Sequence, residues 1–172
     1  MTKEITTPFS EEVISSLNVG DMVYISGEII CGRDAVLPKV VDMLKKGTVS
    51  QLGIDLQGGV IFHTAVSPAG VGPTSSNKLE IESSIAPLSA GGIKLHLGKG
   101  ELHPETIKAL AENNSVYAVI PPVTALLEQQ TISQRVAAFP ELGMEALHIL
   151  KVEKFPAIIA AAKGRSIYDA DK

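Results

Sequence analysis

The order of apolar, strand-like segments and capped helical segments constrains the fold of this chain most. Four segments have the composition or the alternation of strands: residues 22–30, 59–66, 93–100 and 115–120. Two segments between them have helical spacing, residues 37–46 and 104–114, and each carries a proline in its first turn. Strands that alternate with helices along a chain are typical of α/β folds.

The two ends of the chain add further elements. We predict a helix over residues 10–17, capped by the serine that begins it, and another over residues 123–130. Two strands, at residues 146–155 and 157–162, follow with no helix between them. Strands clustered at the end of such a chain indicate a mixed sheet. We therefore expect a single α/β domain over residues 1–172.

The composition narrows the class of protein. Lys and Arg number 15 against 19 Asp and Glu, without a long run of either sign, which disfavours nucleic acid and anionic membranes as partners. Aromatic residues make up 4% and Trp is absent, which disfavours a stacking platform for single-stranded nucleic acid. The apolar runs are far shorter than a membrane span, and the first residues lack the apolar core of a signal peptide. We therefore expect a soluble cytoplasmic protein.

Three predicted loops share one property: each follows an apolar strand and places a cation beside glycine. They are Cys31-Gly32-Arg33-Asp34, the segment GPTSSNK at 72–78, and Gly98-Lys99-Gly100. Ligands of α/β proteins bind where strands end and loops begin. Cations that converge there suit a small molecule with two or more carboxylates.

Each loop also has a purely structural interpretation. Arg33 and Asp34 can form a local ion pair, with Asp34 capping the next helix. The hydroxyls of residues 74–76 can cap a helix, and Gly98-Lys99-Gly100 can be a surface turn. The sequence alone leaves these alternatives open.

The histidines and the cysteine give weaker signals. His63 lies within an apolar segment, which favours a hydrogen-bonded core residue over a metal ligand. The other three histidines show no metal-site spacing: His96, His103 and His148. The single cysteine, Cys31, has no histidine partner nearby and is interpreted as a small core residue. One cysteine can form neither an internal disulfide nor a cysteine-ligated cluster within this chain.

Four stretches, taken in order, give the chain a familiar pattern: GDMVYISGEIICGRDA, GPTSSNKLE, GKG and ELGMEALHILKVEKFPA. Together they resemble the β subunit of the class I iron–sulfur fumarate hydratases and L-tartrate dehydratases. They equally resemble the C-terminal domain of the single-chain enzymes. The resemblance runs from about Gly20 to Asp169 and implies a swivelling β/β/α domain.

The resemblance implies an enzyme whose metal is held by another polypeptide. In this family a [4Fe–4S] cluster is carried by a separate α subunit or N-terminal domain, in agreement with the single cysteine here. The β/β/α domain closes over the cluster, whose open iron acts as a Lewis acid on the leaving hydroxyl. The implied assembly is an α2β2 hetero-oligomer with a small dicarboxylate substrate, and homo-oligomers are left open for the isolated chain.

Position by position, the resemblance implies roles for four residues. Arg33 matches a ligand of a substrate carboxylate, and Lys99 matches a lysine that contacts the substrate. Lys78 falls where the family usually has a carboxylate-binding arginine. Thr74 matches a residue proposed to transfer a proton at the substrate carbon, although a threonine needs nearby cations or a relay to do so. Cations beside a substrate carboxylate stabilise the aci-carboxylate that forms as the C–H proton leaves.

The implied reaction is the interconversion of fumarate and (S)-malate, as in the tricarboxylic acid cycle, or the dehydration of a related hydroxy diacid such as tartrate. Three departures from the family pattern leave a second function open: Lys78 for arginine, Leu37 for a usual histidine, and Pro121-Pro122 for Gly-Gly. Lysine cannot make the planar two-point contact of arginine. The alternative is a catalytically inactive paralogue that binds diacids as a regulatory module. A hydrolase with Thr74 or Ser75 as nucleophile is disfavoured, since no nucleophile elbow is present.

Overall fold

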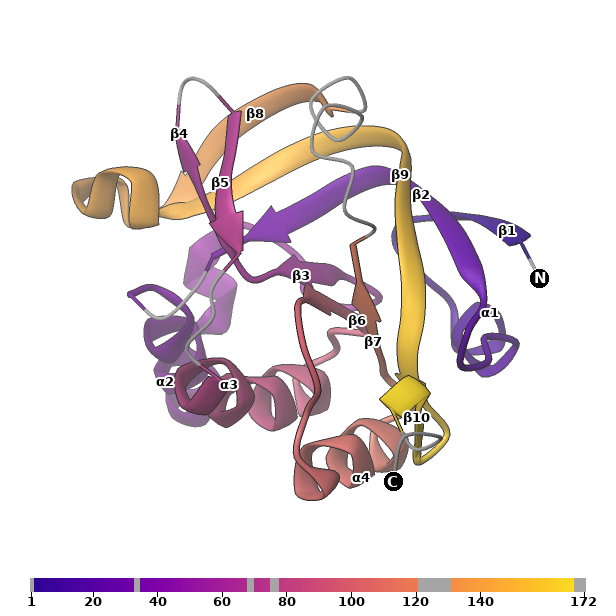
Figure 1. Ribbon diagram of the computed structural model, residues 1–172. Helices are drawn as coiled ribbons and strands as arrows, with labels where there is room; N and C mark the ends of the chain where they lie inside the picture. The colour runs from indigo at the N-terminus through magenta and orange to yellow at the C-terminus, as the bar shows by residue number, and fades with distance from the viewer. Residues whose placement is uncertain (1, 33–34, 68–69, 75–77, 121–130, 169–172) are drawn as a thin grey trace.

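Five strands close into a barrel in the computed structural model (Figure 1), which describes residues 2–32, 35–67, 70–74, 78–120 and 131–168. For residues 65–67, 70–74, 78–81 and 131 the backbone alone is described. The barrel strands are β2 (Met22–Cys31), β3 (Val60–Phe62), β6 (Leu95–Gly98), β7 (Val116–Val119) and β9 (Leu147–Ala162). The first four are parallel neighbours in this order, and β9 is antiparallel to both β7 and β2, which closes the ring. The predicted α/β class with a mixed sheet is confirmed.

The alternation of side chains along these strands decides what fills the barrel. Phe62, Leu95 and Leu97 belong to the interior cluster, where Phe62 meets Phe155 edge to face at 5.8 Å between ring centroids. Ile61, one residue earlier in β3, packs instead with the apolar side chains of the helices outside. Since both faces of β3 and β6 are covered, even the one polar residue of these strands, His96, is buried.

Three helices cover the outer face of the parallel strands (Figure 1): α2 (Leu37–Lys46), α3 (Lys78–Ala90) and α4 (Pro104–Glu112). The bounds of α2 are those predicted from its sequence, and Gly47 ends it with φ 72°. A short helix, α1 (Glu11–Ser15), begins where predicted, because the Ser10 Oγ accepts a hydrogen bond from the Val13 N–H at 3.2 Å. None of the described helices has the length and apolar composition that crossing a bilayer requires.

The prediction of two separate late strands is wrong. Residues 147–162 form the single strand β9, which pairs with β2 from His148 to Ile158. Its other edge pairs with β8 (Thr131–Ala138) up to Val152 and with β7 from Ile158 onward. Pro156 falls between these two pairings, so its missing N–H interrupts neither ladder, and the strand continues through it.

Other elements differ from the prediction in their bounds or were not predicted. The segment 59–66, expected as one strand, is divided at His63 into β3 and β4 (Thr64–Ser67), and β4 pairs with β5 (Gly70–Thr74) in a separate hairpin. Four described strands and two 3-10 segments have no counterpart among the predictions: β1 (Thr2–Thr6), β5, β8, β10 (Arg165–Ser166), η1 (Val49–Leu52) and η2 (Pro140–Glu145). The helix expected at 123–130 lies outside the described residues.

Candidate functional site

Three neighbouring parallel strands direct the predicted site segments to one edge of the barrel. Cys31, the last residue of β2, pairs with Phe62 at the end of β3, and Phe62 pairs with Leu97 of β6. Arg33 comes two residues after Cys31 in the sequence but lies outside the described residues. Lys99 comes two residues after Leu97, and its side chain is exposed.

Thr74 reaches the same edge by another route. Thr64, the second residue after Phe62, pairs with Thr74 across the β4–β5 hairpin. The backbone of Thr74 therefore lies beside the strand end that β3 shares with β2 and β6. Lys78, the fourth candidate, is the first residue of α3, and residues 75–77 lie outside the described part of the chain. The functional roles of all four residues stay predictions.

The Gly98-Lys99-Gly100 loop has a defined structural basis. A Cβ on Gly98 would lie 3.1 Å from the ring of Tyr117, a residue of the neighbouring strand β7. Gly100 has φ 84°, a conformation that side chains disfavour, and its carbonyl oxygen accepts a hydrogen bond from the Tyr117 hydroxyl at 3.1 Å. Burial raises the pKa of Tyr117 above its ordinary value, so this hydroxyl stays a donor. Lys99 is thus presented to solvent between two constrained glycines.

Two buried histidines lie at or near these strand ends, and their contact was not predicted from the sequence. His63 follows β3, and His96 lies within β6. The Nε2 of His63 lies 3.1 Å from the Nδ1 of His96, and the Nε2 of His96 lies 3.0 Å from the Oγ of Ser89 in α3. The two rings stack with 5.4 Å between centroids. Both histidines are fully buried, and desolvation lowers the pKa of His63 to about 3 and that of His96 well below its ordinary value. Both rings are therefore neutral near pH 7.

The expectation for His63 is only partly right. It is a core residue, as predicted, but its Nδ1 is buried and has no hydrogen-bond partner in the described part of the chain. His63 and His96 are 33 residues apart in the sequence. Only the pairing of β3 with β6 brings them together, so no local pattern could have revealed the pair.

A carboxylate fixes the segment that follows the glycine loop. Glu82 of α3 accepts hydrogen bonds from the backbone N–H of His103 at 2.7 Å, from its Nδ1 at 2.6 Å and from the Thr106 hydroxyl at 2.8 Å. Burial raises the pKa of Glu82, but these hydrogen bonds outweigh burial and hold the pKa below its ordinary value. The start of α4 is thereby tied to α3.

The described residues do not fit an iron–sulfur cluster. Cys31, the only cysteine of the chain, is fully buried in the barrel interior. Burial raises the pKa of its thiol, which disfavours the thiolate that binds iron. Within the described ranges, no three His, Cys, Asp or Glu side chains group as metal ligands.

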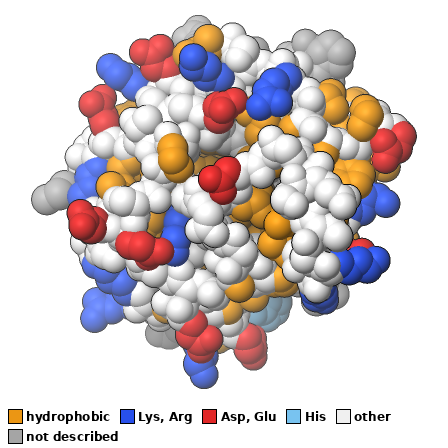
Figure 2. Space-filling model, turned by 180° about the vertical axis from the view of Figure 1, so that it is seen from behind, with side chains coloured by type: hydrophobic (Ala, Val, Ile, Leu, Met, Phe, Trp, Pro, Cys, Tyr) orange, Lys and Arg blue, Asp and Glu red, His pale blue; other side chains and the backbone are white. Residues whose placement is uncertain are grey.

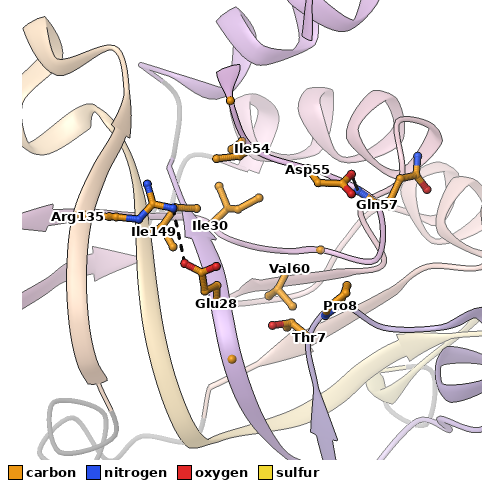
Figure 3. Close-up of a pocket in the computed structure, with 13 residues that line it drawn as sticks. Thr7, Pro8, Glu28, Ile30, Ile54, Asp55, Gln57, Val60, Arg135 and Ile149 are labelled. Carbon is orange, nitrogen blue, oxygen red and sulfur yellow. Dashed lines mark hydrogen bonds and ion pairs between the residues drawn. The ribbon is translucent and has the colours of Figure 1, made fainter. Parts of the chain in front are cut away.

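A cavity of about 440 Å³ lies away from this edge, near the start of β3 (Figure 3). Its walls include Glu28 and Arg135, whose side chains face each other at 3.6 Å, with Asp55 and Gln57 on another side. Arg135 is the one cation among the described wall residues, and its ion pair with Glu28 means that these residues offer no surplus positive charge to a diacid. Lys99, the one predicted site residue whose side chain the structure describes, does not line it.

The rear face of the molecule presents charges of both signs. Asp and Glu side chains are interspersed there with Lys and Arg, and hydrophobic side chains gather mainly over one half of the face (Figure 2). The described side chains of this face therefore form no extended patch of one charge.

Comparison with known proteins gives consistent matches over nearly the whole chain. The family model described as Fumarase C-terminus matches residues 2–170. The chain is 31% identical over 171 residues to a Methanocaldococcus jannaschii protein provisionally named L(+)-tartrate dehydratase subunit beta, covering 91% of this chain and 86% of the relative. It is 27% identical over 173 residues to the L(+)-tartrate dehydratase subunit beta of Escherichia coli K12, covering 94% and 83%. It is also 30% identical over 165 residues to fumarate hydratase 2 of Leishmania major, covering 90% of this chain but 28% of that protein.

Proposed function

Because this chain belongs to the Fumarase C-terminus family, as a relative of the β subunits of L(+)-tartrate dehydratase, we propose that it is the substrate-gripping subunit of a cytoplasmic hydro-lyase. The complex interconverts fumarate and (S)-malate, or dehydrates a related hydroxy diacid such as tartrate. This chain supplies the cations that hold the carboxylates and the residue that moves the C–H proton.

One observation carries this proposal: the register of β2, β3 and β6. Cys31, Phe62 and Leu97 are paired neighbours, and Arg33, Thr64 and Lys99 each come two residues later in the sequence. Thr64 is paired in turn with Thr74. Segments that leave adjacent parallel strands at the same level supply the ligands of α/β proteins.

The substrate class follows from charge. A diacid has two carboxylates to hold, and loss of the proton beside one of them builds further negative charge on that carboxylate. Lys99 is exposed and forms no ion pair with the described residues, so its charge is available to a ligand. In the proposed site Lys99, Arg33 and Lys78 bind the carboxylates, and Thr74 takes part in removing the C–H proton.

We assign the [4Fe–4S] cluster to a separate α subunit, in an α2β2 complex. The buried Cys31 thiol does not suit iron binding, which supports this assignment. The role of this chain is then limited to binding, orientation and proton transfer at the substrate.

The test is anaerobic co-expression with a cluster-bearing α partner, followed by assays of fumarate hydration and of tartrate dehydration. We expect turnover of at least one of these diacids by the purified complex. Absence of turnover with any small hydroxy diacid, in a complex whose cluster is intact by spectroscopy, contradicts the proposal.

A second function, the diacid-binding regulatory module, is favoured by one observation. Leu37 stands where the family usually has a histidine, and it is buried at 1% exposure in the core that α2 forms with the barrel. No polar group is therefore available at this position. Calorimetry of the isolated chain with (S)-malate, together with activity assays of its complexes, separates the two functions. A regulatory module binds the diacid, and its complexes with iron proteins show no turnover.

A further inference from the structure

The chain of hydrogen bonds Ser89–His96–His63 ends at an atom that no described residue contacts by a hydrogen bond. The Nδ1 of His63 is buried, and no hydrogen-bond partner for it exists in the described part of the chain. Buried polar atoms in folded proteins nearly always have a partner, so an isolated one indicates a group that binds there.

His63 follows β3 directly, at the strand ends where the candidate site is built. The backbone N–H of His63 donates a 3.0 Å hydrogen bond to the carbonyl oxygen of Leu97, two residues before Lys99. The next residue, Thr64, pairs with Thr74. The backbone at His63 and Thr64 is therefore paired with the two segments that carry Lys99 and Thr74.

The hydrogen bonds of the chain can run in one direction from α3 to this end. If the Ser89 hydroxyl donates to His96 Nε2, then His96 Nδ1–H donates to His63 Nε2, and His63 Nδ1 carries a proton. In this arrangement the Nδ1–H of His63 is a neutral donor that has no acceptor among the described residues. A carboxylate or hydroxyl oxygen is such an acceptor.

We propose that His63 Nδ1 donates a hydrogen bond to an oxygen of the bound hydroxy diacid, which makes His63 a substrate-binding residue. This inference rests on the proposed function and adds a neutral donor to its cations. The lowered pKa values of both rings support this role, because a neutral imidazole keeps this donor arrangement across the physiological pH range.

Two substitutions separate this role from a structural one. His63→Asn keeps a polar group near the position of Nδ1 and loses the contact with His96. His63→Gln keeps a polar group near the position of Nε2 and loses the ligand contact. A purely structural role of the pair with His96 requires that His63→Gln be the milder change.

The measurements are the KM and kcat for (S)-malate and L(+)-tartrate in the complex with the cluster-bearing α subunit, and calorimetric binding of (S)-malate to the full chain. We expect His63→Gln to weaken binding about 10- to 100-fold and His63→Asn to weaken it about threefold or less. Ser89→Ala, which removes the first donor, is expected to weaken binding by a few-fold without unfolding the protein.

The outcomes are distinguishable. If the wild-type chain binds and turns over a diacid and His63→Gln does so equally well, the inference is wrong and the proposed function stands. If the wild-type chain neither binds nor turns over a diacid, both are wrong. If His63→Asn does not fold, as judged by circular dichroism, unchanged affinity in both His63→Gln and Ser89→Ala overturns the inference.

Discussion

The hydroxyl of Tyr117 donates a 3.1 Å hydrogen bond to the carbonyl oxygen of Gly100, on the far side of Lys99 from Gly98. The same tyrosine ring occupies the space that a Cβ on Gly98 would need. One buried side chain of β7 therefore contacts both glycines that flank the predicted substrate lysine. These contacts hold the Gly-Lys-Gly segment against β7.

We expect Tyr117→Phe to reduce kcat/KM of the complex several-fold and to lower the free energy of unfolding by about 1 kcal/mol. The ring still packs against Gly98, but the Gly100 carbonyl loses its donor and the loop loses its anchor. Steady-state kinetics and urea unfolding measure the two effects.

A double-mutant cycle with Lys99→Ala provides the decisive control. If Tyr117 acts by placing Lys99, then Tyr117→Phe has no further kinetic effect once Lys99 is removed. Fully additive kinetic effects contradict this role. Tyr24→Phe, at a half-buried tyrosine of β2, is the matched control for loss of a phenol hydroxyl.

We predict that Arg33→Ala and Lys99→Ala each lower turnover by on the order of a hundredfold, because each removes a cation that stabilises the developing charge. Lys108→Ala, at an exposed lysine of α4, is the control and leaves turnover unchanged. Normal turnover in both site variants places the site elsewhere.

Lys78→Arg is expected to strengthen diacid binding by about tenfold, because a guanidinium makes a two-point contact with a carboxylate and an ammonium makes a point contact. Calorimetric titration with (S)-malate measures the change. Lys78→Gln should weaken binding in the same assay. Weaker binding in Lys78→Arg would show that Lys78 does not contact the carboxylate.

The buried histidines make stability depend on pH. Their pKa values in the folded state lie below the ordinary 6.5, so below about pH 6.5 the unfolded chain binds protons that the folded chain does not. The histidines therefore do not reduce the free energy of unfolding above pH 6.5. Below this pH the free energy of unfolding falls as the pH decreases, by up to about 1.4 kcal/mol per pH unit for each histidine.

Urea unfolding between pH 7.5 and 5.0 tests this dependence. His96→Gln removes one of the two groups and should reduce the slope by about half. The carboxylates with lowered pKa values, Glu11, Asp21 and Glu82, lose their contribution only below their ordinary values of 4.5, 3.8 and 4.5, so they do not enter this range. An identical slope in the variant and the wild type contradicts the prediction.

The features that could be predicted from sequence are local ones. The helix at 37–46 was placed correctly because Pro38, two terminal lysines and Gly47 each act within one turn. Glycine and a cation after successive strands are also a local pattern, but the site that this pattern predicts at Arg33, Thr74, Lys78 and Lys99 stays a prediction.

The features that could not be predicted depend on pairing between distant residues. Closure of the barrel requires Met22 to pair with Ile158, and nothing near either residue specifies that partner. The His63–His96 contact depends on the register of β3 and β6 in the same way. The sequence predicts a strand end at Pro156, because its place between the pairings with β8 and β7 is set by distant residues.

The double pairing of β9 has a consequence for how the molecule assembles. Residues 147–162 form the last barrel strand in the sequence, and the barrel closes only through their hydrogen bonds to β2 and β7. A nascent chain that has been synthesised only to residue 146 contains all four described α-helices and every parallel barrel strand, yet its apolar lumen is still exposed to water. Loss of β9 would therefore open the barrel and expose its interior, whereas loss of an edge strand such as β1 would leave the barrel closed.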